Sequence, residues 1–192
     1  FLDDHPDYIS KVILILICVN GSADEDYKNE IFSIIERINS KTENISIDQP
    51  VTLLNRDIEF EQYLALLSEA DVYMVSTLRE GMNLTCHEFI CATEALHSPL
   101  ILSEFVGSAS VLTKGPLISN PYNIKEVASD IYKCLTMSAV EKTERWNSTF
   151  QEVMNNDSIT WVKKCINDID LAYDKSTLTQ THSILTPLSS EK

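Results

Sequence analysis

The chain has 192 residues, 29 of them acidic and 15 basic, with a formal net charge of −14. This length allows one domain with a sizeable core, and 44% apolar with 23% charged residues is ordinary for a globular protein. The acidic balance argues against nucleic acid as a partner, and no apolar run reaches the roughly 18 residues that a membrane span needs.

The first part of the chain predicts strands that alternate with helices. The acidic opening, Phe1–His5, is not a secretory signal, and we expect a longer parent polypeptide. The continuous, β-branched run Lys11–Val19 is typical of a strand buried on both faces. Helical spacing of apolar residues predicts helices over Tyr27–Ile38 and Phe60–Leu67, with a strand at Val51–Leu54 between them.

The middle of the chain predicts three more strands, at Val72–Ser76, Leu100–Ser103 and Leu117–Ser119. The polar turn after the first of these leads into a helix that we expect to run from Leu84 to about Leu96. A strand, a loop and a helix start in this order make up the place where open α/β sheets bind ligands. Free amides at such a helix start favour an anion.

The last part of the chain predicts three helices, over Ile124–Met137, Val140–Met154 and Ile159–Tyr173, the third capped at Asp157-Ser158. We expect residues 1–173 to form one α/β, Rossmann-like sandwich around a parallel sheet. Residues 174–192 are rich in Ser and Thr without periodicity, which predicts a disordered or loosely docked tail.

The cysteines and histidines indicate no metal site. The five cysteines contain no CxxC pair, and their odd number and apolar surroundings predict reduced, mostly buried thiols of a cytoplasmic protein: Cys18, Cys86, Cys91, Cys134 and Cys165. His87 is expected on a helix surface. The apolar face of the last helix, which includes Trp161 and Ile169, is expected to pack in a core; the alternative is that part of this face is exposed where a second domain would cover it.

The segment Asp71–Leu84, with its Arg-acid-Gly-Met-Asn-Leu motif, resembles the donor-sugar loop of the trehalose-6-phosphate synthases, glycosyltransferase family 20. The resemblance continues through Leu100–Ala109 and Ser119–Asn123, and it spans residues 1 to about 170. It implies the C-terminal, donor-binding half of a two-domain GT-B fold. Members of this family transfer glucose from UDP-glucose to glucose-6-phosphate without a metal ion or cofactor.

The resemblance implies a UDP-glucose-like site without a catalytic residue in this half. It assigns Glu80 to donor-glucose hydroxyls and Glu88 to the uridine ribose. Between them lie the residues whose backbone amides would face the sugar and the diphosphate: Gly81, Met82, Asn83 and Leu84. Without the resemblance, Glu80 is expected to be a solvated loop acid, and Glu88 a first-turn acid that stabilises its helix.

Two departures from the enzymes favour an inactive site. The enzymes carry Asp where this chain has Glu80, and the longer side chain moves the carboxylate by about 1.5 Å, where a shift of about 1 Å can cost about 100-fold in rate. The enzymes also place an Arg in the turn after the first strand, whereas residues 19–24 contain no Arg or Lys. A phosphate site without its cation lacks charge-assisted hydrogen bonds.

The sequence of Glu80–Ile90, and that of Asn155–Ser158 followed by Trp161, most resembles the non-catalytic regulatory subunits of the fungal trehalose synthase complex. We therefore expect a catalytically silent regulatory domain in trehalose biosynthesis, with the synthase and phosphatase subunits as partners. The alternative is the donor-binding domain of an active UDP-glucose:glucose-6-phosphate glucosyltransferase. A third hypothesis is a pocket that binds UDP-glucose or a sugar phosphate as a sensor.

Overall fold

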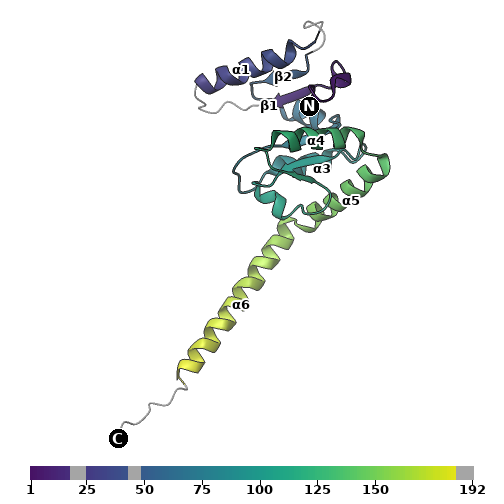
Figure 1. The fold of residues 1–192 in the computed structure, drawn as a ribbon. Helices are drawn as coiled ribbons and strands as arrows, with labels where there is room; N and C mark the ends of the chain where they lie inside the picture. The colour runs from purple at the N-terminus through teal and green to yellow at the C-terminus, as the bar shows by residue number, and fades with distance from the viewer. Residues whose placement is uncertain (18–24, 43–48, 185–192) are drawn as a thin grey trace.

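Parallel strands and helices alternate along the structure, a computed structural model that describes residues 1–17, 25–42 and 49–184, with residues 176–184 described as backbone only (Figure 1). Strand β1, Leu14–Ile17, pairs in parallel with β2, Val51–Leu54. Strands β3, β4 and β5 form a second parallel sheet in that order, at Tyr73–Val75, Leu100–Ser103 and Leu117–Ser119. The predicted parallel α/β architecture is confirmed.

The helices lie close to the predicted ranges: α1 is Glu25–Asn39, α2 Phe60–Ser68, α3 Leu84–Ala92, α4 Ile124–Thr136, α5 Ala139–Asn155 and α6 Ser158–Ile184, with short 3₁₀ turns η1 at Pro6–Tyr8 and η2 at Gly107–Ser110. Helix α3 ends earlier than predicted. The amides of Leu96 and His97 both donate to the Thr93 carbonyl, and His97 has a positive φ of 52°. This turn interrupts the helical hydrogen-bond ladder before Leu96.

The prediction of a first strand buried on both faces is wrong for the described residues. Ile13 is 68% exposed, and Leu14 and Ile15 are also exposed. In the described structure β1 pairs only with β2, so its apolar side chains are not enclosed by the three-stranded sheet. The pattern of apolar residues reports what a strand is suited to bury, whereas its neighbours decide what is buried.

Helix α6 extends away from the two sheets (Figure 1). It passes through residue 173 without a break and ends at Ile184, so the first part of the expected tail is helical. The division between a domain at 1–173 and a tail at 174–192 stays a prediction. The predicted core packing of Trp161 and Ile169 is wrong, because both lie exposed on this projecting helix. No helix in the described ranges combines the length and apolarity of a membrane span.

The core lies between the three-stranded sheet, α3 and α5. All four residues of β4 are buried, and they pack near the fully buried Phe89 of α3. Trp146 of α5 donates a hydrogen bond from Nε1 to the Ile90 carbonyl at 3.0 Å. The Trp146 ring also stacks with Phe150, with ring centres 4.7 Å apart. This one side chain therefore joins α5 to α3, the helix that begins at the candidate site.

Replacement of Trp146 by Phe is expected to lower the free energy of unfolding by about 2 kcal/mol. The smaller ring leaves unfilled volume and removes the donor to the Ile90 carbonyl. The matched control is Trp161→Phe on α6, which is expected to change stability by less than about 0.5 kcal/mol because this side chain is 66% exposed. Urea unfolding of both variants measures the difference, and equal losses would contradict the packing role of Trp146.

Candidate functional site

The candidate site lies at the carboxyl ends of β3 and β4, where two loops meet. The loop after β3 contains Glu80 and Gly81, and the loop after β4 contains Val106 and Gly107. Glu80 forms an isolated parallel bridge with Val106, and the Gly107 amide donates to the Glu80 carbonyl at 3.0 Å. The predicted loop is thus held by its neighbour in the position where open α/β sheets bind ligands.

The two glycines at this junction are not equivalent. A Cβ atom on Gly107 would lie 1.8 Å from the Gly81 carbonyl oxygen and 2.9 Å from its carbonyl carbon. A Cβ atom on Gly81 would meet nothing within 4 Å. Close backbone approach therefore requires glycine at 107, whereas position 81 is open on its outer side.

Asn83 is the N-cap of α3 and connects the helix to Glu80. Its Oδ1 accepts from the Cys86 amide at 2.9 Å and from the Thr85 hydroxyl at 2.7 Å. Its Nδ2 donates to Glu80 Oε2 at 3.1 Å. An N-cap usually satisfies only helix amides; here it also orients a carboxylate. The Tyr73 hydroxyl lies 2.9 Å from that of Thr85 and connects this network to β3.

Ser108 alters one part of the predicted site. Its buried hydroxyl accepts from the Asn83 amide at 2.9 Å and lies 3.1 Å from the Asn83 carbonyl, to which it donates. The Asn83 amide is therefore not free for a sugar or phosphate in this structure. No acceptor within the described ranges is bonded to the amides of Gly81, Met82 or Leu84.

The two glutamates of the predicted site are both held by neutral donors. Glu80 is half-buried and accepts from Asn83, so it is not simply a solvated loop acid. Glu88 is exposed on α3 and accepts from the Tyr63 hydroxyl of α2 at 2.5 Å. The reading of Glu88 as a first-turn acid is wrong, because α3 begins at Leu84 and has no acidic residue in its first turn.

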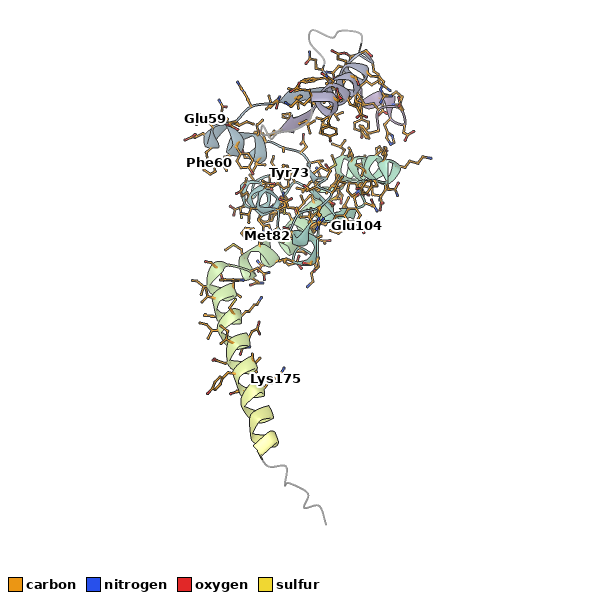
Figure 2. The ribbon with its side chains drawn as sticks, turned by 90° about the vertical axis from the view of Figure 1, so that its left-hand side faces the viewer. Glu59, Phe60, Tyr73, Met82, Glu104 and Lys175 are labelled. Carbon is orange, nitrogen blue, oxygen red and sulfur yellow. The ribbon has the colours of Figure 1, made fainter. Side chains whose placement is uncertain are left out.

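An open hollow of about 530 Å³ lies beside Glu80 and Gly81. It also borders the loop after β4, with Glu104, Phe105 and Gly107 in its wall. Neither Lys nor Arg lines it, so a phosphate placed here would meet carboxylates without a cation from these described residues. Figure 2 shows Met82 and Glu104 in the body that contains the three-stranded sheet, far from Lys175 on α6.

The described residues contain no group of three His, Cys, Asp or Glu side chains suited to a metal ion. The turn at 19–24, predicted to lack the phosphate-binding cation, lies outside the described residues, as does Cys18. Cys86 and Cys134 are buried as predicted, whereas Cys91 is exposed. Burial raises the pKa of the Cys86 thiol to about 11 and favours its neutral form.

His87 is more enclosed than its predicted surface position. It is half-buried, and its Nε2 is buried without a hydrogen-bond partner among the described residues. Burial lowers the pKa of His87 because a charged imidazolium would lose water there.

Three supporting side chains were missed by sequence reasoning: Tyr63, Tyr73 and Ser108. Tyr63 lies within the predicted helix Phe60–Leu67, and Ser108 lies within the segment Leu100–Ala109 that carries the resemblance. The sequence feature that could have identified these three residues is a hydroxyl group in a segment that is otherwise buried. A buried hydroxyl is expected to have a hydrogen-bond partner.

Replacement of Gly107 by Ala is expected to lower the free energy of unfolding by about 2 kcal/mol or more. The new methyl group overlaps the Gly81 carbonyl, and backbone at a loop junction cannot rotate away as a side chain does. Gly81→Ala is the matched control, with an expected change below about 0.5 kcal/mol. Thermal and urea unfolding compare the pair, and a silent Gly107→Ala variant would refute the close approach.

The chain matches known proteins over most of its length. The model of the family described as "Glycosyltransferase family 20" matches residues 1–171. The trehalose synthase complex regulatory subunit TPS3 of Saccharomyces cerevisiae is 48% identical over 187 residues, 97% of this chain and 18% of the relative. The regulatory subunit TSL1 of the same yeast is 46% identical over 90% of this chain and 16% of the relative. The chain thus spans less than a fifth of these relatives.

Solved structures share the fold. The N-terminal domain of a Candida albicans trehalose-6-phosphate phosphatase superposes with a TM-score of 0.80 at 35% identity, covering 88% of this chain and 36% of that one. A structure from E. coli described as bound with UDP-2-fluoro glucose has a TM-score of 0.77 at 28% identity, covering 87% of this chain and 38% of that one. With these matches, the Rossmann-like half of a GT-B fold is established, and the chain belongs to glycosyltransferase family 20.

Proposed function

We propose that this chain is part of a regulatory, catalytically silent subunit of a trehalose-6-phosphate synthase/phosphatase complex. The observation that carries the proposal is the difference in similarity among relatives. Two regulatory subunits are 48% and 46% identical to this chain over nine tenths of its length or more. In Schizosaccharomyces pombe, a protein named as a putative 100 kDa subunit of the UDP-forming synthase is 42% identical over 84% of this chain, and one named as the UDP-forming synthase is 32% identical over 88%.

The electrostatics of the site support a silent role. Transfer of glucose from a nucleoside diphosphate builds negative charge on the leaving group, which enzymes stabilise with preorganised donors and cations. In the described structure the Glu80 carboxylate accepts a hydrogen bond from the neutral side-chain amide of Asn83. The adjoining hollow is lined by a second acid, Glu104. The backbone amide of Asn83, an expected donor to the ligand, donates to the Ser108 hydroxyl instead.

The partners under this proposal are the synthase and phosphatase subunits, in the cytoplasm. The chain's part is to assemble with them through a fold inherited from a glycosyltransferase. Assembly requires surface complementarity and not a working donor site. Changes confined to the Glu80 carboxylate are therefore expected to leave assembly intact.

A second candidate is the donor-binding domain of an active UDP-glucose:glucose-6-phosphate glucosyltransferase. The observation in its favour is that the backbone amides of Gly81, Met82 and Leu84, beside a helix start, have no acceptor among the residues that the structure describes. The E. coli structure described as bound with UDP-2-fluoro glucose shares this fold at 28% identity. A pocket that binds UDP-glucose as a sensor without turnover uses the same amides.

The full-length protein that contains this chain is expected to transfer no glucose from UDP-glucose to glucose-6-phosphate when it is purified alone. Mixed with the synthase and phosphatase subunits, it is expected to co-elute with them in size-exclusion chromatography. Glu80→Gln is expected to co-elute equally well. Exposed Glu144 of α5 provides the matched control, Glu144→Gln, outside the hollow.

Two results would contradict the proposal. Transfer by the purified protein, abolished in Glu80→Gln and retained in Glu144→Gln, would establish the second candidate instead. Failure to co-elute with either subunit would remove the regulatory role. Coupled detection of released UDP measures the transfer. Typical enzymes accelerate their reactions by at least about 10⁶-fold, so an active and a silent protein differ clearly in this assay.

A further inference from the structure

An apolar patch lies exposed at the rim of the hollow, on β5 and on the loops after β4 and β5. Phe105 and Ile118 line the hollow, and they are 40% and 41% exposed. The Phe105 ring meets that of Tyr122 edge-on, with ring centres 5.9 Å apart. Tyr122 and Ile124 are more exposed still, at 70% and 80%. We call Phe105, Ile118, Tyr122 and Ile124 the rim patch.

Hydrogen bonds of the backbone hold the rim patch in its exposed position. The Glu104 amide donates to the Ser119 carbonyl at 3.0 Å, which ties the loop after β4 to the end of β5. The Tyr122 amide donates to Oδ1 of Asn120 at 2.9 Å and fixes the turn that precedes α4. Phe105 and Tyr122 are therefore held at the surface in a defined position, and such a preorganised surface loses little conformational entropy when a partner binds.

The hollow beside the rim patch is acidic. Glu80 and Glu104 line it, whereas Lys and Arg are absent from its lining residues in the described structure. Glu104 is exposed, and its carboxylate forms no hydrogen bond or ion pair within the described ranges. Lys125 is exposed beside Ile124, outside this lining. With a net charge of −14 over the whole chain, this surface favours a basic partner.

The shape and chemistry of the surface fit a protein segment better than a small molecule. Small-molecule sites enclose most of their ligand, whereas this hollow is open. Exposed apolar side chains rimmed by polar ones are typical of protein–protein contacts. Arginine is the side chain that suits the hollow, because its guanidinium pairs with a carboxylate and also stacks on an aromatic ring. Glu104 and Phe105 are adjacent in the sequence and offer one group of each kind.

We propose that the rim patch and Glu104 form a docking site for a protein segment that carries an arginine next to an apolar side chain. The inference rests on the proposed function, since the segment belongs to another subunit of the same complex. Its arginine enters the hollow beside Glu104 and Phe105, and the apolar neighbour covers Tyr122 and Ile124. Glu80→Gln leaves Glu104 unchanged, so that variant is still expected to co-elute.

Phe105→Ala and Glu104→Arg in the full-length protein test this proposal. The matched controls are Phe32→Ala on α1, where the ring is 45% exposed, and Glu144→Arg on α5, outside the hollow. Isothermal titration calorimetry against the purified synthase subunit and the purified phosphatase subunit, each alone, gives the dissociation constants of every variant.

Phe105→Ala and Glu104→Arg are each expected to weaken binding to one of the subunits by about tenfold or more, because a few anchor residues carry most of the affinity of an interface. Both controls are expected to stay within about twofold. Glu104→Gln is expected to reduce the dependence of the affinity on salt, since it removes one charge pair from the interface. Tyr122→Ala takes the place of Phe105→Ala if urea unfolding shows that Phe105→Ala does not fold.

Unchanged affinity for both subunits in Phe105→Ala and Tyr122→Ala would overturn the proposal, and so would equal losses in the controls. Unchanged affinity together with a lower free energy of unfolding of the full-length protein would likewise overturn it, because another segment of the same polypeptide then covers the rim patch. These results leave the proposed function in place as long as the unchanged protein binds a subunit. If it binds neither subunit, the proposed function and the docking site both fail.

Discussion

The close backbone contact between Gly107 and Gly81 is the constraint on which the candidate site depends. It brings the loop after β4 against the loop after β3, with the Gly107 amide bonded to the Glu80 carbonyl at 3.0 Å. The next residue, Ser108, is bonded to both the amide and the carbonyl of Asn83. The start of α3 is thereby fixed to a neighbouring strand's loop, which explains how an exposed loop holds a defined shape.

This arrangement lies where a nucleotide-sugar site is expected in the family, but its charges do not suit a diphosphate. Asn83 caps α3 and at the same time holds Glu80, so the carboxylate has a set direction. The hollow beside it contains Glu104 as a second acid, with neither Lys nor Arg among its described lining residues. Family membership explains why the architecture is present. The charges are what favour a regulatory role over catalysis, because a diphosphate is bound chiefly through opposite charge.

Tyr63 and Tyr73 show how the outer face of α3 is bound to its neighbours. Tyr73 of β3 bonds to Thr85, and Tyr63 of α2 bonds to Glu88, so the two tyrosines reach polar atoms on one helix. Both rings pack against the core while their hydroxyls contact the site, which is a common use of buried tyrosine. The two tyrosines therefore tie polar atoms of α3 to β3 and to α2.

Local pattern was sufficient for most of the fold and for the location of the site. β-branched runs and helical spacing predicted every described strand and the six long helices. The Arg-acid-Gly-Met-Asn-Leu motif predicted both the family and the loop. These features depend on residues close together in the chain, where backbone preference and periodicity act.

Tertiary structure alone decided which of these features are buried, bonded or free. The exposure of Ile13, the bond between Ser108 and the Asn83 backbone amide, and the contact of Tyr63 with Glu88 were not predicted from the sequence. Each involves residues far apart in the chain or the absence of a neighbour among the described elements. A sequence pattern states which surface a segment is able to bury and which atoms need partners. The packing of distant segments determines whether and by what these needs are met.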